Sequence, residues 1–151
     1  MFKKILVAVD GSDPSVHALE VAATVAKQNK ASLTIVTVVP PIPPMVEGDM
    51  PHYVPDFSKD LRESYANMLN NQVKKLKEKH PDLEVEAVVT EGNPARKIIE
   101  KAGEHMADMI IVGNRGRSGV LSWMMGSVSR AVSDACTVPV LVVKNEKYCK
   151  A

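Results

Sequence analysis

The sequence predicts an α/β protein built on an open, parallel, doubly wound five-stranded sheet. Three observations support this fold class. Short, continuously apolar runs recur along the chain, which is typical of strands buried on both faces. Segments with apolar residues at helical spacing lie between them, and two cap-plus-proline pairs mark helix starts. Strands that alternate with helices imply right-handed crossovers and helices on both faces of the sheet.

The first part of the chain predicts a strand, a helix and a second strand. The apolar run 5–9 forms the first strand. Asp13 and Pro14 predict a helix start, with Asp13 as the N-cap and proline at the first helical position. A second strand follows at 33–39. Residues 40–56 hold six of the ten prolines, so they predict a loop over one end of the sheet.

The middle of the chain predicts a long amphipathic helix that ends before Pro81. Its apolar stripe consists of Leu61, Tyr65, Met68, Leu69, Val73 and Leu76. The run 83–89 alternates apolar and acidic residues at its start, which indicates a half-exposed strand at a sheet edge. Asn93 and Pro94 repeat the cap-plus-proline pair and predict the next helix.

The last part of the chain predicts a short buried strand at 109–112, followed by a glycine-rich turn. A helix then begins near Gly126 and Ser127. Its apolar face consists of Val128, Ala131, Val132 and Ala135. The final strand runs from Val138 to Val143.

Composition predicts one domain over residues 1–151, because no repeat, polar linker or composition break divides the chain. The 19 basic and 18 acidic side chains give a net charge of +1. No global field therefore attracts the chain to nucleic acid or to an anionic membrane. The N-terminal apolar run stops at Asp10, too short for a signal peptide or a membrane span, so we expect a cytoplasmic protein. Cys136 and Cys149 lack zinc-site spacing and are expected to be free thiols.

The segment between Gly113 and Ser129 has residue types that suit a polyphosphate. It joins a buried strand to a helix, at the edge where open α/β sheets bind ligands. Glycine lets backbone N–H groups approach an anion, and the helix start at Gly126 adds unpaired N–H groups. Ser127 and Ser129 add hydroxyls, and Arg115 adds a guanidinium group. The alternative is a tight turn in which Ser127 is a plain N-cap.

Two familiar phosphate motifs are missing from the sequence. No GxxxxGK[ST] occurs, which excludes a P-loop NTPase, and no GxGxxG follows the first strand. The four histidines stand at neither triad nor metal spacing, and no general base is evident. The sequence therefore favours phosphate binding over fast catalysis.

The glycine spacing resembles the signature of the ATP-binding branch of the universal stress protein family. The matching residues are Gly113-x2-Gly116-x9-Gly126-Ser127. Residues 5–12 resemble that family's first strand and turn, and residues 139–143 resemble its last strand. The similarity extends from Lys3 to Lys144. It implies a Rossmann-like sheet with strand order 3-2-1-4-5.

The resemblance implies a nucleotide site with ATP and Mg²⁺ (or Mn²⁺) as its ligands. The implied binding residues are Ala8, Asp10, Val38, Val112, Gly113, Arg115, Gly116, Gly126, Ser127, Val128 and Ser129. The glycines and serines would hold the phosphates, while the apolar residues would line the adenine and ribose. Asp10 would line the nucleoside part of the site, although a carboxylate at this position can also cap a turn. The metal ion would ride on the phosphates.

Three functions stay open at this point. The first is a regulatory module that binds ATP and hydrolyses it slowly at most. The second is a genuine ATPase or phosphotransferase, and the third is an interaction module that binds AMP or another nucleotide. In each case the strand from Val138 to Val143 would expose a hydrophobic edge, so we expect a homodimer through it, as the resemblance also implies.

Overall fold

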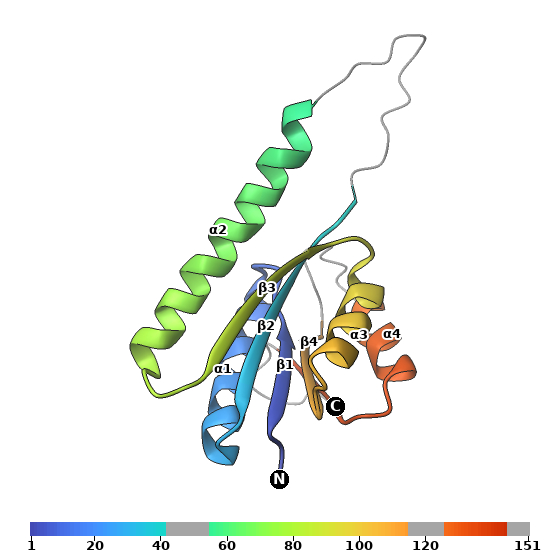
Figure 1. Ribbon diagram of the computed structural model, residues 1–151. Coiled ribbons are helices and arrows are strands. Elements are labelled where there is room, and N and C mark those ends of the chain that lie inside the picture. The colour runs from blue at the N-terminus through green and yellow to red at the C-terminus, as the bar shows by residue number, and fades with distance from the viewer. Residues whose placement is uncertain (42–54, 115–125, 145–151) are drawn as a thin grey trace.

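The computed structural model describes residues 1–41, 55–114 and 126–144, and Figure 1 shows their arrangement. In chain order its elements are β1 (Lys4–Ala8), α1 (Asp13–Asn29), β2 (Ser32–Val39), α2 (Pro55–Lys79), β3 (Val85–Glu91), α3 (Pro94–Glu104), β4 (Met109–Gly113), α4 (Ser127–Ala135) and β5 (Val140–Val143). Within these described ranges, no helix combines the length and apolar character that a membrane crossing requires. Most of the predicted proline-rich loop and the centre of the glycine-rich turn lie outside the described residues.

The five strands form one parallel sheet in the order β3-β2-β1-β4-β5, which confirms the predicted fold class and strand order. In β1, Ile5 pairs with Leu33 of β2 on one side and with Met109 of β4 on the other. The chain builds outward from β1 through β2 to β3, then returns to the other side of β1 for β4 and β5. The strand order therefore reverses between β1 and β4, the place where such sheets bind ligands.

The helices cover both faces of the sheet. Figure 1 shows α1 and α2 on one side, with α3 and α4 on the other. Successive residues of a strand point to opposite faces, so Val7 packs into the core under α1 while Leu6 packs into the core under α3 and α4. Both side chains are fully buried. This two-sided burial explains the continuously apolar sequence of β1.

The helix starts follow the predicted chemistry with one correction. Asn93 caps α3, because its side chain accepts a hydrogen bond from the N–H of Arg96 at 3.1 Å, as predicted. The predicted N-cap Asp13 is wrong, since Ser12 is the N-cap of α1 and its hydroxyl accepts from the N–H of Ser15. Asp13 lies in the first turn instead, where its negative charge favours the positive end of the helix dipole.

Two strands are shorter or shifted relative to prediction. β3 is an edge strand, as expected, but it begins at Val85 because the N–H of Leu83 donates to the His80 carbonyl in the preceding turn. Val89 is 40% exposed on this edge strand. β5 begins at Val140, since Pro139 has no N–H and contributes only its carbonyl to the N–H of Ile110.

Candidate functional site

The carboxyl ends of three neighbouring strands bring together the predicted apolar wall. Ala8 ends β1, Val38 lies near the end of β2, and Val112 lies near the end of β4. All three side chains pack on the face that α3 and α4 cover. Ala8 is half-buried, while Val38 is 8% exposed and Val112 is 3% exposed. The structure therefore gathers these residues beside the point where the strand order reverses.

Asp10 lies in the turn between β1 and α1, next to this wall. Its Oδ1 accepts hydrogen bonds from the N–H of Ser12 at 2.9 Å and from the Ser12 hydroxyl at 2.5 Å. The alternative that the carboxylate caps a turn is therefore confirmed. Asp10 is half-buried, and its role beside a nucleoside stays a prediction.

Two buried hydroxyls hold the backbone on either side of this turn. Thr37, fully buried in β2, donates its hydroxyl to the carbonyl of Val9 at 2.7 Å. Ser15, 4% exposed, accepts from the N–H of Asp10 at 3.2 Å and donates to the carbonyl of Ser12. Sequence reasoning missed these roles. Ser12, two residues after Asp10, was the available signal for the turn itself. Thr37 stood out only as a polar residue in an apolar run.

Gly113 ends β4 against the first turn of α1. A Cβ at Gly113 would lie within about 3 Å of the Pro14 backbone, closer than ordinary van der Waals contact. Close helix-to-strand packing thus favours glycine here, independently of any ligand. The role of Gly113 beside a ribose or phosphate stays a prediction.

The start of α4 lies at the same end of the sheet. Gly126 is its N-cap and makes no side-chain capping hydrogen bond, so the alternative of Ser127 as the N-cap is wrong. Ser127 is the first helical residue and is exposed, while Val128 packs against the α3/α4 core. Ser129 is 2% exposed, and its hydroxyl lies 3.0 Å from the Gly126 carbonyl and 3.3 Å from that of Asn114.

This geometry separates the two predicted serines. The Ser129 hydroxyl has one proton and carbonyl acceptors for it within the fold, so it secures the start of α4 to the end of β4. The Ser127 hydroxyl is on the surface at the positive end of the helix dipole. A binding role for either serine stays a prediction, as it does for Arg115 and Gly116, which lie outside the described residues.

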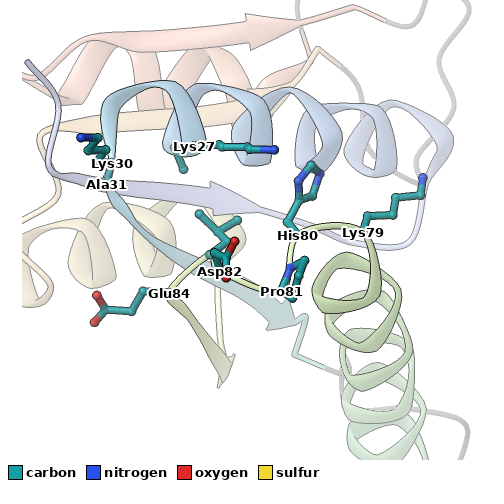
Figure 2. A pocket seen from close by; sticks show the side chains of 10 residues that line it. Lys27, Lys30, Ala31, Lys79, His80, Pro81, Asp82 and Glu84 are labelled. Carbon is teal, nitrogen blue, oxygen red and sulfur yellow. The ribbon is translucent and has the colours of Figure 1, made fainter.

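A cavity of about 320 Å³ lies at the opposite end of the sheet, between the C-terminal end of α1 and the connection from α2 to β3 (Figure 2). Its charged lining residues carry both signs: Lys27, Lys30, Lys79, Asp82 and Glu84. The buried Nδ1 of His80 has no hydrogen-bond partner among the described residues. Two helix C-termini point their negative dipole ends here, which disfavours a phosphate. This cavity is therefore distinct from the predicted nucleotide site.

The described residues also bear on metal binding. Nowhere in the described ranges do three or more His, Cys, Asp or Glu side chains gather in a way that could hold an ion. Near the carboxyl ends of β1 and β4, the described polar groups include the carboxylates of Asp10 and Asp13, the Asn114 amide, hydroxyls and backbone amides. Such an arrangement can bind and orient a ligand.

Comparison with known proteins gives a consistent result. The sequence model described as the universal stress protein family matches residues 1–144. Universal stress protein YxiE of Bacillus subtilis is 35% identical over 95% of this chain and 100% of its own length. A universal stress protein of Methanocaldococcus jannaschii is 33% identical over 97% of this chain and 85% of its own length.

A solved structure supports the same relationship. It is a universal stress protein in complex with cAMP, and it superposes with a TM-score of 0.71 at 26% identity. The match covers 96% of this chain and 98% of that protein. The shared strand order, the full-length sequence matches and the family match agree, and this chain belongs to the universal stress protein family.

Proposed function

We propose that this protein is a regulatory module that responds to an adenine nucleotide, with ATP and Mg²⁺ (or Mn²⁺) as its ligands. The observation that carries the proposal is the coincidence of three features at one corner of the sheet. The apolar wall of Ala8, Val38 and Val112, the Asp10 turn and the start of α4 all lie where the strand order reverses.

Each feature suits contact with a different part of the nucleotide. The apolar wall suits the adenine and ribose, and Asp10 provides an oriented acceptor for the nucleoside part. Gly126 leaves the first amides of α4 without a side-chain cap, so these amides and the exposed Ser127 hydroxyl suit phosphate oxygens. Arg115 and Gly116 belong to this proposal through the glycine signature.

The relative solved with cAMP adds support for an adenine nucleotide. It also favours a second candidate, in which a mononucleotide rather than ATP is the ligand that this protein senses. Both candidates use the same nucleoside wall and differ in how much of the start of α4 the ligand contacts. Competition among ATP, AMP and cAMP decides between them.

We propose that binding, rather than turnover, is the activity. Phosphoryl transfer needs a positioned metal, a group that orients the nucleophile and a group that stabilises charge. Two carboxylates lie near this corner. One oxygen of Asp10 already accepts two hydrogen bonds, and Asp13 lies in the first turn of α1. The divalent ion would be held by the phosphates and water, as is common for Mg²⁺. Slow hydrolysis at most is the expected outcome.

The test is calorimetric titration of the protein with ATP and Mg²⁺, with AMP and with cAMP. Ser127→Ala is expected to weaken ATP binding about ten-fold, because it removes a hydrogen bond to a charged group. Ser133→Ala, an exposed serine of the same helix, is the matched control and should bind as the wild type does. If none of the three nucleotides binds at millimolar concentration, the proposal fails.

We also propose that two copies associate through β5. Leu141 is 37% exposed on this edge strand, and the strand consists of valines and leucine. Hydrophobic sheet edges of this kind are covered or paired in stable proteins. Such a dimer would bring two nucleotide sites, one from each copy, into one assembly joined through β5.

A further inference from the structure

The Ser12 side chain takes part in two separate hydrogen bonds with different physical roles. As the N-cap of α1, its oxygen accepts from the N–H of Ser15 at 3.4 Å. As a donor, its hydroxyl proton goes to Oδ1 of Asp10 at 2.5 Å. Capping requires only the oxygen lone pair, so the bond to Asp10 is additional to what α1 needs.

The bond to Asp10 acts on a carboxylate whose backbone is already fixed. Thr37 holds the carbonyl of Val9, and Ser15 holds the N–H of Asp10. Both of these anchoring side chains are buried. With the backbone held in this way, the orientation of the Asp10 carboxylate depends on the contacts of its side chain. Two donors from Ser12 onto Oδ1 restrict that rotation.

We infer that Ser12 is a positioning residue for nucleotide binding: it holds the Asp10 carboxylate in the orientation that the bound nucleoside meets. This inference rests on the proposed function and on contact between Asp10 and the nucleotide. Orienting the side chain before binding avoids the entropy cost of ordering it in the complex. Ser12 itself does not need to touch the ligand.

The test is a double-mutant cycle between Asp10 and Ser12, read as the dissociation constants of ATP with Mg²⁺, AMP and cAMP. Ser12→Ala should weaken the tightest of these ligands about two- to ten-fold, the cost of ordering one side chain. In the Asp10→Ala background the same change should have no further effect, because its target is gone. Ser12→Thr keeps the hydroxyl and should restore wild-type affinity.

Two further variants separate positioning from helix capping. Glycine is nearly as good an N-cap as serine, so Ser12→Gly keeps α1 stable while removing the hydroxyl, and it should lose affinity as Ser12→Ala does. Asn93→Ala removes the cap of α3 without touching Asp10. It should lower the melting temperature and leave nucleotide affinity unchanged.

The outcomes distinguish the inference from the proposed function. Wild-type protein that binds none of the three nucleotides overturns both. Nucleotide binding that is insensitive to Asp10→Ala, or to both Ser12→Ala and Ser12→Gly, overturns the inference alone. An equal loss from Ser12→Ala in the wild-type and Asp10→Ala backgrounds also overturns it, because Ser12 would then act independently of the carboxylate.

Discussion

A Cβ built on Gly113 would lie 3.0 Å from the carbonyl carbon of Pro14 and 3.1 Å from its oxygen. The end of β4 and the first turn of α1 are therefore packed as closely as backbone allows. This contact lies next to the Asp10 turn, so it joins two parts of the proposed site. The first glycine of the family signature has a packing role of its own at this position.

Gly113→Ala is expected to destabilise the protein by about 1–3 kcal/mol, because overpacking forces backbone to shift. The neighbouring atoms belong mainly to the Pro14 backbone, which cannot rotate away as a flexible side chain would. Urea unfolding monitored by circular dichroism measures the change. An unchanged midpoint would show that α1 moves freely away from β4.

Gly103 in α3 provides the matched control for this substitution. A Cβ there meets no atom within 4 Å, and the residue is helical. Gly103→Ala should therefore stabilise the protein by about 0.5–1 kcal/mol, since alanine loses less backbone entropy in a helix. Opposite signs for the two glycine substitutions are the expected result.

Thr37→Val should cost about 1–3 kcal/mol, because it leaves the Val9 carbonyl without its buried hydroxyl donor while preserving the side-chain shape. Thr24→Val is the comparison. The Thr24 hydroxyl donates to the Glu20 carbonyl on the exposed surface of α1, where water can replace it. That variant should stay within about 0.5 kcal/mol of the wild type in the same unfolding assay.

Burial raises the pKa of the Cys136 thiol, so less of it is thiolate at a given pH. In a Cys149→Ser variant, alkylation of Cys136 by iodoacetamide should be slow, and its rate should rise at higher pH than for an exposed thiol. The control places cysteine at exposed position Thr137, with Cys136 and Cys149 both changed to serine. Equal pH profiles for the two thiols would contradict the effect of burial.

Association through β5 can be tested by removing an outward backbone N–H. The Pro139 carbonyl accepts from Ile110 of β4, and the Val143 carbonyl accepts from Asn114 just after β4. The alternate residues Val140 and Val142 therefore direct their backbone groups toward the open edge. Val142→Pro should therefore convert a dimer to a monomer in analytical ultracentrifugation at micromolar concentration. Circular dichroism should show the same fold, because proline is tolerated on edge strands.

The opposite edge of the sheet provides the control for this substitution. The Glu84 carbonyl accepts from Leu33 of β2, so Val89 directs its N–H away from β2. Val89→Pro should leave the dimer intact. A monomeric wild-type protein, or dimers that both substitutions leave unchanged, would rule out pairing through β5.

Local sequence patterns predicted most of the fold because each depends on near neighbours. Helical and strand periodicity located the nine elements that the described residues form, and Asn93 followed by Pro94 located the start of α3. The capping prediction at Asp13 was wrong because Ser12, one residue earlier, has the backbone geometry that a cap requires. The apolar wall of the proposed site came from the family resemblance rather than from local patterns, and its three members share one face.

By itself, the sequence determined the order of the elements and the parallel sheet. The end of the sheet at which a ligand would bind stays a prediction. Only the tertiary structure decided which polar groups contact Asp10, how closely Gly113 approaches Pro14 and which serine near α4 faces solvent. Periodicity and capping act over a few residues, so sequence reveals them. The contacts of Thr37 with Val9 and of Gly113 with Pro14 join distant segments, and they exist only once the strands pair and the helices pack.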